Sequence, residues 1–167
     1  MDAAAPSMRF GLAPMCRLIR VMTIVIAALP AVFLIAGALG PRILWSPALV
    51  IVIVYAWVWT RFRPTAFVVR SHALDVIWPL KATEISRDQI TAVRLVDRQE
   101  LRQQVGWGMR VGAGGLWGGF GWLWTSRRGI VQMYVSRLDG FVWIERGAER
   151  PWLITPERPD AFVRALT

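Results

Sequence analysis

Two long runs of uncharged, mostly apolar residues constrain this chain more than any other feature of its sequence. Residues 21–41 and residues 43–60 contain no charged side chain, and only Arg42 separates them. At a rise of 1.5 Å per residue, about 20 apolar residues cross a hydrocarbon layer about 30 Å thick. The first run satisfies this length and the second is close to it. The sequence therefore predicts a transmembrane helical hairpin over residues 21–60.

Two other interpretations of these runs stay open. The runs could form a buried helical hairpin in the core of a soluble protein, because a core helix is also apolar. The first run could instead be a secretory signal peptide, since the small residues Ala36-Gly37-Ala38 resemble a cleavage site. In that case the second run alone would cross the membrane, from outside to inside. The remainder of the chain would then lie on the same side of the membrane as it would after a two-helix hairpin.

The arginines that flank the runs predict the orientation of the hairpin. Three arginines precede the first run and three follow the second within ten residues, whereas the tip between the runs has Arg42 alone. Positively charged loops stay in the cytoplasm, so both ends of the chain are expected there. We therefore expect a two-pass protein of the cytoplasmic (inner) membrane, with a cytoplasmic N-terminal tail at residues 1–20 and a cytoplasmic domain at residues 61–167. The lone cysteine, Cys16, is consistent with a reducing compartment.

Residues 61–167 have the pattern of a small antiparallel β domain closed by one helix. Short apolar runs alternate with turn residues, which is typical of strands and hairpins. The expected strands are 66–70 and 73–80 as a first hairpin, 90–96, 129–137 and 141–146 as a second hairpin, and 152–154. Asp139-Gly140 is the turn signal of the second hairpin. Thr155 is expected to cap a final helix over residues 156–166.

These segments resemble the bacterial PH (pleckstrin-homology-like) domains that follow an N-terminal transmembrane hairpin. The likeness is carried by the stretches FVVRSHALDVIWPL, ISRDQITAVRLVD, GIVQMYVSRLDGFVWIE and WLITPERPDAFVRAL. It implies about seven antiparallel strands in two sheets with one C-terminal helix. It also implies a non-catalytic interaction module that binds a protein partner or a lipid head group at the cytoplasmic face of the membrane.

The segment at 111–126 is rich in glycine and tryptophan and has no charge. It contains no G-x-G-x-x-G fingerprint, because Trp117 stands where the third glycine belongs. It is a bulged core strand, a loop, a third membrane span or an exposed apolar surface. For the last case, the candidate membrane or partner contacts are Trp117, Phe120, Trp122 and Trp124.

Four basic residues are candidates for contact with anionic lipid: Arg61, Arg63, Arg70 and Lys81. Each cation close to an anionic leaflet contributes about 1 kcal/mol of attraction. Arg61 and Arg63 could equally serve only to orient the second span. Eukaryotic phosphoinositide-binding PH domains carry more basic residues around their first hairpin than this sequence does, and acidic residues scattered among the arginines argue against nucleic acid.

Most catalytic chemistry is excluded by composition. One cysteine and one histidine, His72, cannot supply a multi-ligand zinc site. No catalytic, metal-binding or cofactor-binding residue is expected, and residues 97–104 are expected as a polar loop or a short exposed helix. The expected partners are the bilayer, an unidentified protein and further copies of the chain. Two other functions stay open: a subunit of a membrane complex that oligomerises through its spans and the Gly/Trp segment, and an enzyme with an unrecognised site.

Overall fold

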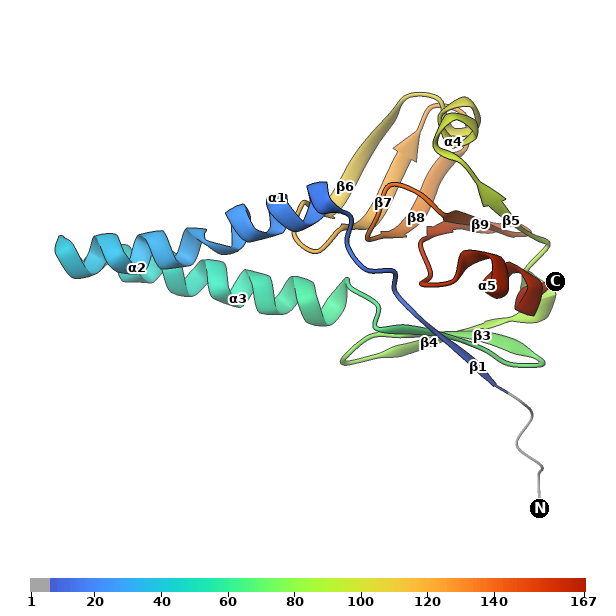
Figure 1. Cartoon of the computed structure of the whole chain (residues 1–167), viewed down its shortest axis with the longest axis horizontal. Helices are drawn as coiled ribbons and strands as arrows, with labels where there is room; N and C mark the ends of the chain where they lie inside the picture. Colours follow the sequence, from blue (N-terminus) through green and yellow to red (C-terminus); the bar gives the residue numbers. More distant parts are fainter. Residues whose placement is uncertain (1–6) are drawn as a thin grey trace, which may run out of the picture.

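The computed structural model describes residues 7–167, which form a helical hairpin joined to a domain made mainly of strands (Figure 1). The hairpin consists of α1 (Arg17–Ala27), α2 (Leu29–Leu39), the short turn η1 (Arg42–Leu44) and α3 (Trp45–Arg61). Pro30 lies in the first turn of α2, where the backbone N–H that proline lacks would have no partner within the helix. The chain bends at this point, between α1 and α2 (Figure 1).

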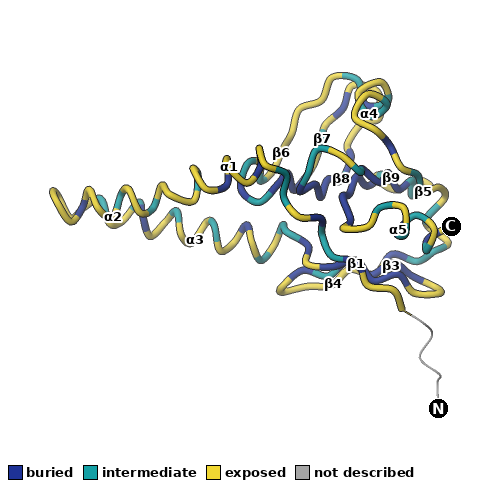
Figure 2. The backbone as a smooth tube through the Cα atoms, viewed as in Figure 1, coloured by how far each residue is buried: buried dark blue, intermediate teal, exposed yellow. Residues whose placement is uncertain are grey.

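The helical hairpin projects from the domain instead of lying inside it. Its two long helical stretches, Arg17–Leu39 and Arg42–Arg61, are each long and apolar enough to cross a membrane. Only 11% and 6% of their apolar windows are buried, and Figure 2 shows most of the hairpin as exposed. A core helix would be mostly buried, so the interpretation of these runs as a buried soluble hairpin is wrong.

The strands form two sheets. The first sheet has the order β1 (Met8–Gly11), β2 (Ala66–Val69), β3 (Ala73–Ile77) and β4 (Ala82–Ser86). The second has the order β5 (Ala92–Val96), β9 (Phe141–Arg146), β10 (Glu149–Ile154), β8 (Gly129–Val135), β7 (Gly119–Thr125) and β6 (Gly108–Gly114). Two helices complete the domain, α4 (Arg98–Val105) and the C-terminal α5 (Pro159–Leu166).

Each face of the six-stranded sheet has its own apolar core. One core lies between the two sheets and includes Phe67, Phe120 and Ile144, with Phe162 of α5 packed into it. The other lies beneath α4 and includes Trp143, with Leu101 of α4 packed against it. Asp97 caps α4 by accepting a hydrogen bond from the backbone N–H of Glu100 at 2.7 Å. The two sheets and the C-terminal helix confirm the expected fold class.

The domain has more strands than the expected seven. From residue 66 onward the described chain forms nine, because the Gly/Trp segment makes two strands, β6 and β7, and β4 is an additional one. β4 was not predicted because it is a largely exposed edge strand, in which Ile85 is the one buried residue. The sheet is also not fully antiparallel, because β8 and β10 pair in parallel.

The hairpin expected at Asp139-Gly140 does not form. β10 lies between β8 and β9, so these two strands are not hydrogen-bonded neighbours. The connection at 136–140 therefore spans two strand spacings, about 10 Å, instead of turning tightly. Gly140 still provides the left-handed backbone, with φ of +58°, that the Asp-Gly signal indicated. The true hairpin joins β9 to β10.

Thr155 does not cap the final helix, which begins three residues later than expected, at Pro159. The Thr155 side chain instead accepts a hydrogen bond from the backbone N–H of Ser136 at 2.9 Å, and both residues are buried. Ala13 donates its N–H to the Thr155 carbonyl at 2.9 Å. Thr155 therefore links the end of β10 to Ala13 and Ser136. Its hydroxyl is buried and so requires a hydrogen-bond partner inside the protein.

The N-terminal segment, expected as a tail over residues 1–20, contributes a strand to the domain. β1 pairs antiparallel with β2, so that Gly11 lies opposite Ala66 and Met8 opposite Val69. Phe10 is 3% exposed, and its ring contacts that of Phe162 at 5.3 Å between centroids. The domain expected to begin at residue 61 is thus incomplete without β1, and the helical hairpin is an insertion between two neighbouring strands.

The turn between β6 and β7 fixes the domain against the base of the hairpin. The Thr23 hydroxyl of α1 accepts a hydrogen bond from the N–H of Trp117 at 2.9 Å, and lies 3.2 Å from the Gly115 carbonyl oxygen. The Trp117 ring packs edge-on against Trp59 of α3 at 4.6 Å between centroids. The turn therefore contacts both helices of the hairpin, near the point where they enter the domain.

We predict that β1 is a structural part of the domain. Replacing Phe10 by alanine removes a buried ring and lowers the free energy of unfolding by about 3–5 kcal/mol. Met8→Ala is the matched control on the same strand: Met8 is 58% exposed, so the change should stay within about 0.5 kcal/mol. Urea unfolding of the full chain in neutral detergent, followed by tryptophan fluorescence, measures both. Equal stabilities of the two variants would contradict the assignment.

We also predict a loss of stability at alkaline pH that depends on Tyr134. Burial raises the pKa of Tyr134 to about 12, an effect that the hydrogen bond from Gln132 partly opposes. The folded state therefore favours the neutral phenol, and this contribution is complete below pH 10 and is lost as the pH rises from 10 to 12. The unfolding free energy should fall across that range by up to about 2–3 kcal/mol. In Tyr134→Phe the fall should shrink accordingly, and an unchanged fall would contradict the assignment.

Candidate functional site

The strands β6, β7 and β8 continue beyond the core that lies between the two sheets. In β7 the side chains of Phe120, Trp122 and Trp124 share one face, because alternate residues of a strand point to the same side. Phe120 packs in the core, whereas Trp122 and Trp124 lie past its edge, with exposed fractions of 38% and 59%. The same face is therefore core at one end of the strand and open surface at the other.

The open end of this face carries apolar side chains from all three strands. Trp122 and Trp124 pair with Val111 and Met109 of β6 and with Gln132 and Ile130 of β8. We call the surface formed by the following exposed residues the apolar wing: Trp107, Met109, Val111, Trp122, Trp124 and Ile130. A cluster of large exposed apolar side chains of this kind usually marks an interaction site.

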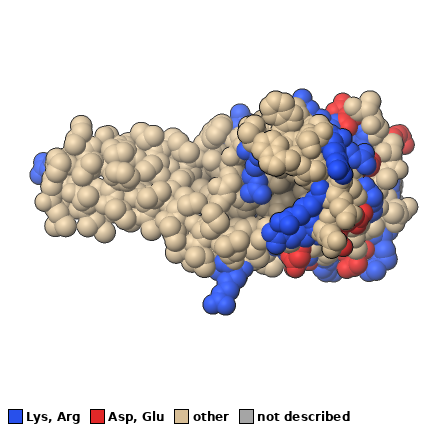
Figure 3. All heavy atoms as spheres, turned by 90° about the horizontal axis from the view of Figure 1, so that it is seen from above, with Lys and Arg blue, Asp and Glu red and all other residues tan. Residues whose placement is uncertain are grey.

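Two shallow hollows shape the apolar wing. One, of about 280 Å³, is lined by Trp122, Trp124, Ile130 and the basic residue Arg150. The other, of about 270 Å³, lies between Trp107, Trp124 and the end of β7. In the view of Figure 3, uncharged surface on the domain lies between groups of Lys and Arg side chains. The hollows offer places for apolar side chains of a partner, with a positive charge beside one of them.

Glycines give the β6–β7 hairpin its shape. Gly112 and Gly121 face each other across the two strands with φ of +135° and +123°, a region that other residues rarely adopt. A Cβ on Gly112 would lie 2.4 Å from the Phe120 carbonyl oxygen. The glycines of this segment therefore allow a close approach of two strongly bent strands, which settles the segment at 111–126 as a hairpin.

The four aromatic residues expected as membrane or partner contacts have different environments. Trp122 and Trp124 lie on the apolar wing. Phe120 is fully buried, so its assignment to an exposed surface is wrong: it lies on the core end of the strand. Trp117 is half-buried at the β6–β7 turn, with φ of +61°, and packs against Trp59 of the same chain.

The other residues of the apolar wing were not predicted from the sequence. Trp107, Met109 and Val111 alternate with Gly108 and Arg110, which is the period-2 signal of a strand with one apolar face. That alternation was the available signal in β6. Ile130 was assigned to a strand but not to the surface, because only the strand order shows that β8 lies beside the exposed part of β7.

Three of the four basic candidates lie near the base of the helical hairpin. Arg61 is the last residue of α3, and the Arg63 guanidinium lies over the Trp59 ring at 4.4 Å. Burial lowers the pKa of Arg63 from its usual value. Lys81 belongs to the β3–β4 turn, whose Trp78 donates its indole N–H to the Phe62 carbonyl at 3.3 Å. Lys81 is exposed and lies over the Trp78 ring.

Arg70 lies away from these three residues. It follows β2, whose four residues lead away from the helical hairpin and separate it from the base by about 13 Å. Its guanidinium forms an ion pair with Asp75 at 2.8 Å, and that carboxylate is mostly buried. Arg70 therefore neutralises a carboxylate of the domain, and the structure does not bring it together with Arg61, Arg63 and Lys81.

The one histidine and the acidic side chains do not gather into a metal-binding cluster in the part of the chain that the structure describes. Within residues 7–167 there is no group of three or more His, Cys, Asp or Glu side chains that could hold a metal ion. His72 lies in the exposed β2–β3 turn, with its Nδ1 at 3.5 Å from the Ser71 hydroxyl. Asp75, on the strand that follows this turn, is paired with Arg70.

Comparison with known proteins identifies the family. The family model described as "Bacterial PH domain" matches residues 65–167, which is more than half of the chain. The matched region begins just before β2 and covers the strands of the domain after β1, together with α4 and α5. Searches of curated proteins and of solved structures gave no significant match. On the strength of the family match, and in agreement with its two sheets and C-terminal helix, the chain belongs to the bacterial PH domain family.

Proposed function

We propose that this protein is a non-catalytic binding module, anchored in the cytoplasmic membrane by its helical hairpin, whose domain binds a protein partner through the apolar wing. Membership of the PH domain family supports a binding module in general terms. The observation that carries the more specific proposal is the apolar wing itself. Its six large side chains stay exposed in a domain that buries apolar residues on both faces of its larger sheet.

The exposure and charge pattern of the hairpin support its role as the anchor. Apolar side chains cover its surface, including Val25, Ile35 and Ile53, each about 60% exposed. Figure 3 shows Lys and Arg at its outer end and where it meets the domain, with an uncharged length between. Such a surface is stable in hydrocarbon and unfavourable in water. The basic residues at the base support a cytoplasmic location for the domain, because positively charged loops tend to stay in the cytoplasm.

The base of the hairpin supplies the surface that would meet lipid head groups. Arg61, Arg63 and Lys81 lie there, and Leu80, beside Lys81 in the β3–β4 turn, is 70% exposed. An exposed apolar side chain next to cations suits the boundary between head groups and acyl chains. We assign lipid contact to this base, with Arg70 excluded by its position and its ion pair with Asp75.

The apolar wing has a direction that favours a protein partner over the bilayer. The β6–β7 turn contacts α1 at Thr23, and the strands run from there obliquely away from the hairpin (Figure 1). Seven residues of strand are about 24 Å long. The end that carries Trp107 and Trp124 therefore lies further from the membrane than the turn does. A flat bilayer that meets the turn would not cover that end.

β6 is also an edge strand, which offers a second mode of recognition beside the hollows. It pairs with β7 on one side only, and six of its seven residues are exposed. An extended segment of a partner can add to such an edge through backbone hydrogen bonds, while its side chains enter neighbouring pockets. The proposed partner is therefore a protein segment that pairs with β6 and places apolar side chains against Trp122 and Trp124.

Photo-crosslinking in intact membranes tests this proposal. A benzophenone amino acid at position 124 of the full-length protein should crosslink to a protein. The same group at position 80 should crosslink to lipid, because Leu80 is exposed at the base of the hairpin. Trp107→Ser together with Trp122→Ser should reduce the protein crosslink from position 124 at least fivefold, and Leu80→Ser is the matched control that should leave it unchanged.

The crosslinked species separates the alternatives. A crosslink from position 124 to lipid alone would contradict the proposal, as would an equal loss of crosslinking in the control. A crosslink to a second copy of the chain would favour instead a subunit that oligomerises through this segment. Trp107 is 76% exposed, so its substitution should change stability by no more than about 0.5 kcal/mol, which unfolding measurements can verify.

A further inference from the structure

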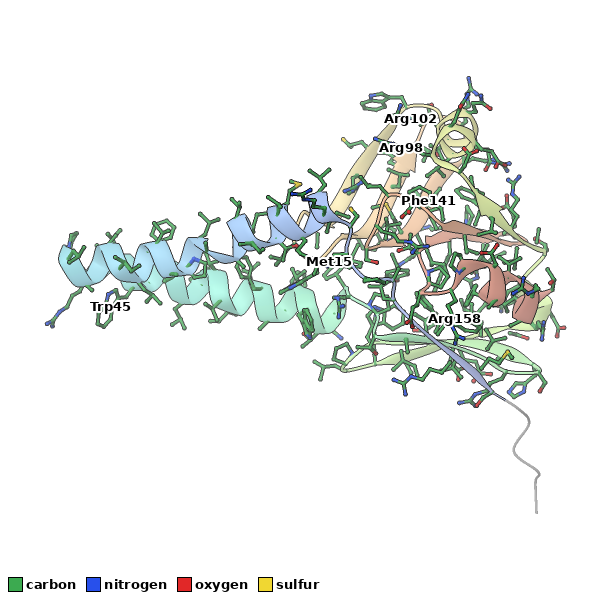
Figure 4. The ribbon with its side chains drawn as sticks, in the orientation of Figure 1. Met15, Trp45, Arg98, Arg102, Phe141 and Arg158 are labelled. Atoms are coloured by element: carbon green, nitrogen blue, oxygen red, sulfur yellow. The ribbon has the colours of Figure 1, made fainter. Side chains whose placement is uncertain are left out.

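A groove between β1 and α5 gathers three arginines on the domain. The groove has a volume of about 410 Å³, and its polar lining is provided by Arg9 of β1, by Arg158 just before α5 and by Arg164 in the last turn of α5. Ala161 and Ala165 form its floor on the helix side, where larger side chains would fill it. Figure 4 shows Arg158 beside β1. Two elements far apart in sequence thus bring positive charge to one hollow.

These three arginines have no acidic partner within residues 7–167. The four ion pairs of the described chain use other arginines: Arg70, Arg94, Arg128 and Arg137. Glu157 and Asp160 are close to Arg158 in sequence, but neither lines the groove nor pairs with any of the three. Arginines that line one hollow without acidic partners leave positive charge uncompensated there unless an anion binds.

The packing around the groove holds two of its sides in place. The Arg158 guanidinium lies over the ring of buried Phe10 at 5.6 Å, which restricts its position. Arg87 donates a hydrogen bond to the Ala165 carbonyl at 2.9 Å and so holds the end of α5. Guanidinium groups are suited to phosphate because each offers several N–H donors in a planar fork. The fold therefore restrains Arg158 and the end of α5 beside the groove.

The groove lies away from the membrane-anchoring hairpin. β1 runs so that Gly11 is level with Ala66, near the end of α3, and Met8 is level with Val69, at the far end of β2. Met8 and Arg9 line the groove at that far end. α5 ends near the β2–β3 turn, because Arg87 bonds both the His72 and Ala165 carbonyls. Head groups of the membrane that holds the hairpin are thus on the opposite side of the domain.

We propose that the groove between β1 and α5 binds a soluble, multiply charged phosphate-bearing anion. Three arginines lining one groove match the charge of a diphosphate group, whose oxygens accept hydrogen bonds from guanidinium N–H groups. The site is separate from the apolar wing and from the basic residues at the base of the hairpin. It gives the module a ligand on its cytoplasm-facing side in addition to a protein partner.

Isothermal titration of the full chain in neutral detergent with pyrophosphate tests this proposal. We expect one site per chain. Arg158→Gln together with Arg164→Gln should weaken binding at least about tenfold, because each lost contact is a charge-assisted hydrogen bond. Arg98→Gln together with Arg102→Gln is the matched control: it makes the same change of net charge on α4, another eight-residue helix. That control should bind within about twofold of the unmodified protein.

A further variant and a lipid competition experiment distinguish recognition at this groove from a general effect of net charge and from lipid binding. Arg9→Gln, on β1, should also weaken binding and does not touch the helix, so it guards against misfolding of α5. Absence of binding to the unmodified chain, or equal losses in the α4 control, would overturn the proposal. In nanodiscs, adding phosphatidylglycerol to phosphatidylcholine should not compete with pyrophosphate; competition that depends on Arg158 and Arg164 would overturn the assignment to a soluble anion. None of these outcomes bears on the crosslinking at the apolar wing.

Discussion

The architecture depends on the pairing of β1 with β2, because these neighbouring strands lie on either side of the helical hairpin in the sequence. The chain leaves the sheet after β1, passes along the hairpin and returns to the adjacent position in β2. Both ends of the hairpin are therefore fixed in one sheet. The turn at Gly115 and Trp117 adds a third contact by hydrogen bonding to Thr23 of α1. A domain held at three points keeps a defined orientation relative to its hairpin, which a single flexible linker would not provide.

That orientation assigns different surfaces of one small domain to different surroundings. Arg63 and Lys81 lie at the base beside the hairpin, the apolar wing rises obliquely from it, and the groove lined by Arg158 opens on the far side. The first hairpin of the PH-like core, with its turn at His72, also lies on the far side. Because the helical hairpin fixes these positions, we propose lipid contact at its base and not at the turn between β2 and β3.

Local pattern predicted much of the fold, and strand order accounts for most of what it missed. Short apolar runs separated by turn residues identified the hairpin of β2 and β3, and charge-free length identified the two long helices. The Asp139-Gly140 signal failed because a turn sequence specifies a reversal of the chain and not which strand lies alongside; β10 occupies that place. β1 was missed because its partner, β2, lies more than fifty residues away in sequence.

The candidate site shows the same division between local and long-range information. The period of a strand predicts which face of the sheet a tryptophan side chain lies on. Whether that face is core or surface depends on how far the strand extends past its neighbours. Phe120 and Trp124 share a face of β7, yet one is fully buried and the other is 59% exposed. The arginine groove is less accessible still to sequence reasoning, since Arg9 and Arg158 meet only after β1 has joined the sheet and α5 has packed against it.

We propose that the helical hairpin crosses the membrane twice, so that its tip and the domain lie on opposite sides. Thiol labelling in intact cells measures this directly. In a Cys16→Ser background, Arg42→Cys reports on the tip and Asp139→Cys on the domain, where the side chain is exposed. A membrane-impermeant maleimide should label position 42 in intact cells and position 139 only after permeabilisation. Labelling of both positions before permeabilisation, or of neither, would contradict the account.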